Sequence, residues 1–87
     1  MEMNASLDGQ QVVNARRAIL NRFVKLDRAP NTIANINLFR GEQDAYRGGY
    51  FEAAIEQLVS DKCIEFAKAA LFLRLMPKGH NEAHDQK

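Results

Sequence analysis

Hydrophobic residues recur at helical spacing between Tyr50 and Ser60. At about 100° per residue, the apolar side chains share one arc, which holds Phe51, Ala54, Ile55, Leu58 and Val59. The polar and small side chains share the opposite arc, which holds Glu52, Ala53, Glu56, Gln57 and Ser60. This period predicts an amphipathic helix with one buried face, and the polar cluster at 60–62 predicts where the helix ends.

The period changes to two after this helix. Ile64 and Phe66 flank Glu65, and the leucines at 71, 73 and 75 alternate with a second set, Phe72, Arg74 and Met76. Alternation is typical of strands, so the pattern predicts a β-hairpin with a turn at 67–70. One continuous helix is the alternative, because the segment is rich in helix formers and its turn lacks Gly, Asn and Asp. A helical projection leaves no polar face, and we therefore favour the hairpin.

The succession of the helix FEAAIEQLV, a polar break, the short strand IEF and a leucine-alternating return strand resembles the recognition helix and wing of the winged helix-turn-helix superfamily. The resemblance rests on residues 50–76. It implies an α+β fold: a small winged-helix-like domain at 8–77, with about three helices and a C-terminal hairpin. An all-α helical bundle is the alternative. We expect a flexible tail at 1–7 and a charged tail without periodicity at 78–87.

The longest amphipathic stretch runs from Gln10 to about Leu26. Its apolar stripe consists of Val12, Ile19, Phe23 and Leu26, broadened by Val13, Leu20 and Val24. Asp8, three residues before Gln11, has the spacing of a capping box at the start of this helix. Arg16 projects into the middle of the stripe. We expect it to snorkel over the edge of the core, and pairing with a carboxylate is the alternative.

The segment between the two helices predicts a second, shorter element. Pro30 ends the first helix, and Ile33, Ile36 and Phe39 at spacings of three fit a short helix closed by Gly41. A brief strand at 36–38 fits the same residues. We expect a polar turn from Glu42 to Arg47.

Composition limits the setting of the chain more than its function. The 87 residues are 46% hydrophobic and 26% charged with a formal net charge of +1, which predicts an ordinary soluble globular domain without a strong overall field. The single cysteine, Cys63, excludes an intrachain disulfide and favours a reducing, cytoplasmic setting. No apolar run approaches the roughly 18 residues that span a bilayer, so we expect no membrane association.

No motif predicts catalysis, a metal site or a cofactor. His80 and His84 have helical spacing with Glu82 between them, but this order differs from that of the zinc metalloproteases and no third ligand is evident. Cys63 lacks an orienting partner for a nucleophile. We therefore expect a protein that is not an enzyme.

Two classes of function remain, and the first is recognition of double-stranded DNA by a transcriptional regulator. The winged-helix resemblance implies DNA-binding roles for Arg40 and Arg47 against phosphates or bases, Tyr50 and Gln57 on the exposed helix, and Lys68 in the wing. The second class is a protein-protein interaction module, a small regulator or inhibitor. It is supported by Glu52 and Glu56, which DNA phosphates would repel.

The strand face opposite the leucines predicts self-association. Phe72 and Met76 alternate with Arg74 on a face that a chain this small has little material to cover. We expect a homodimer with these three residues at or near the interface.

Overall fold

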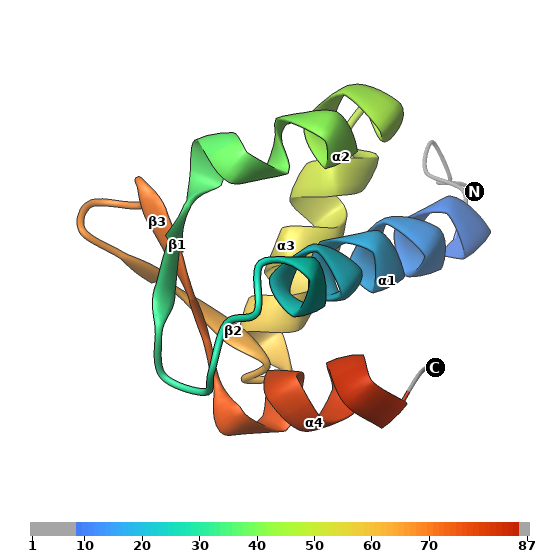
Figure 1. Ribbon diagram of the computed structural model, residues 1–87. Coiled ribbons are helices and arrows are strands. Elements are labelled where there is room, and N and C mark those ends of the chain that lie inside the picture. Colours follow the sequence, from blue (N-terminus) through green and yellow to red (C-terminus); the bar gives the residue numbers. More distant parts are fainter. Residues whose placement is uncertain (1–8, 86–87) are drawn as a thin grey trace.

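The computed structural model describes residues 9–85, which form helices and one small antiparallel sheet (Figure 1). The elements follow in the order α1 (Gly9–Lys25), β1 (Ile33–Asn35), the 3-10 helix η1 (Ile36–Phe39), α2 (Arg40–Ala45), α3 (Tyr50–Ser60), β2 (Ile64–Ala67), β3 (Phe72–Leu75) and α4 (Pro77–Asp85). The tail expected at 1–7 and the capping residue Asp8 lie outside the described residues. Within residues 9–85, each helix is too short or too polar to cross a lipid bilayer.

The predicted hairpin is present, so the α+β fold is confirmed and the all-α alternative is wrong. The strand order is β1-β3-β2, with Leu73 opposite both Ala34 and Phe66, and Leu75 opposite Ile64. Four of these five side chains are buried, whereas Phe66 is 47% exposed. The buried face of the sheet is therefore the one with the predicted leucine period, but Leu71, just before β3, is exposed.

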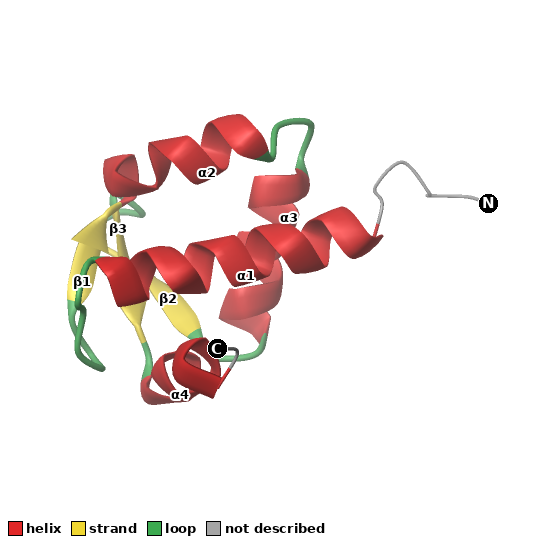
Figure 2. Cartoon of the chain, turned by 45° about the vertical axis from the view of Figure 1, so that its right-hand side comes forward, coloured by secondary structure: helices red, strands yellow, loops and turns green. Residues whose placement is uncertain are grey.

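Helix α1 passes through the centre of the molecule, between α2 and α4, and also contacts α3 (Figure 2). Its buried side chains are Val12, Ala15, Ile19, Leu20 and Phe23, and α3 buries Phe51, Ala54, Ile55 and Leu58. The apolar arcs predicted for both helices are confirmed in their central residues. Val24, Leu26 and Val59 are half-buried, Val13 is exposed, and Leu26 follows the end of α1. The ring of Phe23 lies 4.9 Å from that of Phe39, between centroids, which joins α1 to η1.

Helix α3 ends where the polar cluster predicts, in a Schellman motif. Lys62 has a φ of 63°, its N–H donates to Val59 O, and the N–H of Cys63 donates to Leu58 O. Lysine thus occupies a left-handed position that glycine usually fills. The motif turns the chain sharply and places Cys63 and Ile64 in the core.

The tip of the hairpin is built from consecutive left-handed residues. Lys68, Ala69 and Ala70 have φ values of 51°, 59° and 66°. The tip therefore forms without the Gly, Asn or Asp that a tight turn prefers, at a conformational cost to each residue.

The segment between α1 and α3 contains both predicted elements, a strand and a short helix, at positions that differ from those predicted. The strand lies at 33–35 rather than 36–38, because Ala34 pairs with Leu73 in the sheet and Asn35 then caps η1 through its side chain. Gly41 does not close a helix. It lies in the first turn of α2, where a polar turn was expected, and a bidentate ion pair between Arg22 and Glu42 fixes this helix to α1.

The prediction of an aperiodic tail at 78–87 is wrong for its described part, because α4 extends to Asp85 and packs against α1. Pro77 occupies the first position of this helix, which suits its fixed φ. Gly79 and Ala83, four residues apart, form the buried face of α4. A Cβ atom on Gly79 would lie 2.1 Å from Cys63 O, so only glycine permits this close approach.

The contact at Gly79 predicts a large loss of stability on substitution. Gly79→Ala should lower the free energy of unfolding by at least about 2 kcal/mol, because the clash is with backbone that has little room to move. The control is Gly41→Ala, where the added Cβ meets only Arg22 Nη2 at 3.6 Å. That change should be neutral or stabilise by up to about 1 kcal/mol. Urea denaturation of both variants measures the difference, and equal stabilities would contradict the packing described here.

Candidate functional site

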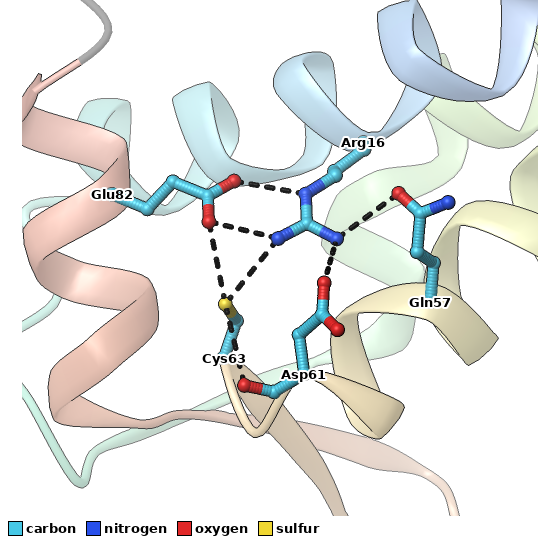
Figure 3. A network of polar contacts seen from close by, with 5 residues as sticks. All are labelled: Arg16, Gln57, Asp61, Cys63 and Glu82. Atoms are coloured by element: carbon cyan, nitrogen blue, oxygen red, sulfur yellow. Dashed lines mark hydrogen bonds and ion pairs between the residues drawn. The ribbon is translucent and has the colours of Figure 1, made fainter.

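Arg16 on α1 is the centre of a cluster with Gln57, Asp61, Cys63 and Glu82 (Figure 3). Its Nε and Nη2 each donate to Glu82 at 2.8 Å, and its Nη1 donates to Asp61 at 2.6 Å and to Gln57 at 3.0 Å. The Arg16 side chain is only 14% exposed. The expected snorkelling is therefore wrong, and the alternative, pairing with carboxylates, is what the structure shows.

The hydrogen bonds of the Arg16 cluster shift the pKa values of its ionisable groups. The hydrogen bonds from Arg16 hold the pKa of the Glu82 carboxyl below its usual range, and those bonds raise the pKa of the guanidinium. Burial, followed by the charge of Glu82, raises the pKa of the Cys63 thiol. A buried thiol with a raised pKa stays protonated and is a poor nucleophile. The cluster thus joins α1, the end of α3 and α4.

A groove between α3 and the hairpin is the second candidate site. It has a volume of about 390 Å³ and is lined by Ile36, Gln43, Phe51, Glu52, Ile55, Glu56, Phe66 and Ala70. We call it the α3 groove. Its apolar wall includes Phe66, which points to the helix-facing side of the sheet but extends beyond the covered part of β2. The groove therefore exposes aromatic surface next to two carboxylates.

The charges at the α3 groove are unbalanced. Glu42, Glu65 and Glu82 each pair with an arginine, namely Arg22, Arg74 and Arg16. Glu52 and Glu56 are exposed, lie four residues apart on one face, and have no ion pair with the described residues. Helix α3 itself contains no lysine or arginine. Two like charges on one helix face repel each other and favour a cationic partner.

The residues predicted to bind DNA do not line this groove. Arg40 is exposed at the start of α2, and Arg47 is exposed in the turn before α3, with Nε 3.4 Å from Asp44 O. Tyr50 is half-buried at the start of α3. Gln57 is exposed, but its side-chain oxygen accepts from Arg16. Lys68 is at the tip of the hairpin, where its Nζ lies 5.5 Å from the centroid of the Phe72 ring.

The residues predicted at a dimer interface are all half-buried. Arg74 forms an ion pair with Glu65, its neighbour across the β2-β3 ladder, and Lys68 covers part of Phe72. Met76 lines a shallow hollow with Val59 and Ile64. The face is thus less apolar than its sequence indicates, and the homodimer stays a prediction.

Sequence reasoning missed two site residues, Glu82 and Phe66. Glu82 was assigned to a tail, although Gly79 and Ala83 at helical spacing were a signal that a close-packed helix is present. Phe66 was predicted on the same strand face as Ile64, and this alternation was correct. Its exposure depends on how far the hairpin extends past α3, which the sequence does not specify.

Within the described residues, no group of three or more His, Cys, Asp and Glu side chains is placed to hold a metal ion. The imidazoles of His80 and His84 lie close together on α4, with centroids 4.4 Å apart and planes tilted by 51°. No protein-family model, curated protein or solved structure matches this chain.

The Arg16 cluster predicts a specific dependence of stability on its partners. Arg16→Met should lower the free energy of unfolding by about 2–3 kcal/mol at pH 7, because Glu82 and Asp61 would lose their cation while remaining partly buried. Arg40→Met, which alters an exposed arginine, should change it by less than about 0.5 kcal/mol. Chemical denaturation of the two variants gives the comparison.

The same cluster predicts a loss of stability in acid. Because the pKa of Glu82 is lower in the folded state, its contribution is complete above the unfolded value of about 4.3 and disappears as the pH falls through the folded value. The difference in unfolding free energy between wild type and Glu82→Gln should therefore be largest near pH 7 and shrink below about pH 4. A difference that stays constant down to pH 3 would contradict this assignment.

Proposed function

We propose that this protein is a non-enzymatic protein-binding module whose α3 groove receives a basic, partly apolar segment of a partner protein. The observation that carries the proposal is the pair Glu52 and Glu56, unpaired and exposed beside an apolar groove. A lysine or arginine of the partner supplies the missing countercharge, and its apolar neighbours cover Phe66 and Ile55. Such arrangements give specificity and fast association as well as affinity.

The size of the groove favours a small anchor within a larger interface. A volume of about 390 Å³ lies at the lower end for ligand pockets. It suits one or two side chains, and binding energy in protein interfaces is concentrated in a few such anchors. The exposed side chains of Leu38 and Leu71, from η1 and the residue before β3, provide further apolar contacts outside the groove.

The non-enzymatic part of the proposal is supported by the chemistry of the Arg16 cluster. Its thiol is buried, and its cation is paired with two carboxylates and with the Gln57 oxygen, so it offers neither a nucleophile nor a free catalytic acid or base. A cytoplasmic location is part of the same proposal, supported by the single cysteine of the sequence, Cys63, which lies in the core.

A second candidate is binding of duplex DNA by a winged-helix-like regulator. It is favoured by one specific observation: α3 is followed directly by the hairpin, as the resemblance implies, and exposed cations lie nearby at Arg40, Arg47 and Lys68. The absence of any cation on α3 and the engagement of Gln57 by Arg16 count against it. We therefore rank it below the protein partner.

The primary proposal predicts selective peptide binding. An amphipathic peptide of leucine and lysine should shift the amide resonances of α3 and the hairpin, while the same peptide with glutamate in place of lysine should not. The double change Glu52→Gln and Glu56→Gln should weaken binding by about three- to tenfold, as expected for two partly exposed ion pairs. Titration followed by ¹⁵N NMR measures both effects.

Two variants control this experiment. Asp85→Asn removes an exposed acid outside the α3 groove and should leave peptide affinity unchanged. Phe66→Ser should weaken binding without removing charge, because it takes away apolar surface in the groove. Equal binding of the lysine and glutamate peptides, or shifts confined to other surfaces, would overturn the proposal.

The DNA candidate predicts the opposite sign for the same acidic residues. With a duplex of about 20 base pairs at about 50 mM salt, Arg47→Ala should weaken binding and reduce its salt dependence by about one counterion. The double glutamine variant should bind the duplex more tightly, by loss of repulsion, although it binds the lysine peptide more weakly. Wild-type protein that shows no duplex binding at this salt concentration would exclude DNA as the ligand.

A further inference from the structure

A second cavity, separate from the α3 groove, lies between the loop after α1 and helix α4. It has a volume of about 630 Å³ and is lined by Val24, Asp27, Arg28, Ala29, Pro30, His80 and His84. We call it the Arg28 cavity. It shares no lining residue with the α3 groove, and neither proposed function uses it. Its lining combines three nitrogen-bearing side chains with an apolar wall.

Arg28 has an unmet hydrogen-bonding requirement in this cavity. Its Nε atom is buried and has no hydrogen-bond partner among the described residues. A buried donor without a partner costs free energy, more so when it carries charge. The guanidinium also forms no ion pair with a described carboxylate. Because the Arg28 side chain lines the cavity, an oxygen acceptor bound there would lie beside a guanidinium without a described anionic partner.

The histidines add donors on the other side of the cavity. His80 is half-buried, His84 is exposed, and both lie on the face of α4 that lines the cavity. Each neutral imidazole offers one N–H donor, and each protonated imidazole offers two and a positive charge. The two rings lie close together, with centroids 4.4 Å apart and planes tilted by 51°.

Asp27 is the one acid in the lining, and it opposes an anion. Its φ of 56° places it in the left-handed region, which asparagine also accepts readily. The Arg28 cavity therefore contains a cation, Arg28, that attracts an anionic ligand and a carboxylate, Asp27, that repels it. Each can be changed with little disturbance of the backbone.

We propose that the Arg28 cavity binds a phosphate monoester of a small organic molecule. Arg28 donates to the phosphoryl oxygens, as guanidinium groups do in proteins, and His80 and His84 donate from α4. Val24, Ala29 and Pro30 contact the organic group. The cavity volume of about 630 Å³ leaves room for that group beyond the phosphoryl oxygens.

The test uses phenyl phosphate as the probe, with inorganic phosphate beside it, on the full chain. Phenyl phosphate should shift amide resonances of 27–30 and 80–84 and should bind more tightly than inorganic phosphate, because of the apolar wall. Equal affinities would overturn the monoester and leave a free-anion site. An absence of saturable shifts at these residues with either probe would overturn the site itself.

Variants of opposite expected sign separate a binding role from a folding role. Arg28→Met should weaken phenyl phosphate binding by about tenfold or more, the usual effect of losing a charged hydrogen bond. Asp27→Asn should tighten it by about threefold, by loss of repulsion. If Arg28→Met fails to fold, Asp27→Asn still decides, since unchanged or weaker binding by that variant contradicts the proposal.

The histidine contribution is tested at one fixed pH with the double change His80→Ala and His84→Ala. The loss of two N–H donors from the lining should weaken phenyl phosphate binding by about tenfold. An unchanged affinity in the double variant would remove the histidines from the site.

Discussion

The structure depends on one charge that is largely covered by protein, the guanidinium of Arg16. Moving such a group from water into a protein costs several kcal/mol unless other polar atoms replace the solvent. Here Glu82 and Asp61 replace it, one from the last helix and one from the end of α3. Glu82 in turn fixes α4 to α1 through its two hydrogen bonds with this cation. Three parts of the chain that are distant in sequence are thus positioned by one side chain.

The parts of the fold that could be predicted are those that local periodicity specifies. The apolar arcs of α1 and α3 and the alternation around Ile64 and Leu73 were sufficient to find two helices and the hairpin. Helix α4 could not be found in this way, because its buried face is made of Gly79 and Ala83 rather than large apolar residues. Its helical state depends on the backbone contact with Cys63 and on the ion pair with Arg16. Neither contact leaves a hydrophobic period in the sequence.

The candidate site was predictable only in its charges. Glu52 and Glu56 were identified as the exposed arc of a helix, and that arc is exposed in the structure. The α3 groove beside them was not predicted, because it depends on the exposure of Phe66, which α3 does not fully cover. Gln57 illustrates the reverse case. It was assigned to an external ligand, yet its oxygen accepts from Arg16, a contact that depends on how α1 packs against α3.

The left-handed tip of the hairpin has a consequence for how this protein tolerates sequence change. Its three residues are held in a costly conformation, and they remain there because β2 and β3 on either side are locked in register by buried side chains such as Leu73. Ala70, one of the three, is also part of the α3 groove. A genetic screen for loss of binding would therefore recover core positions of the sheet as well as surface ones. At this surface, buried residues of the sheet contribute to ligand recognition because they hold the exposed residues in place.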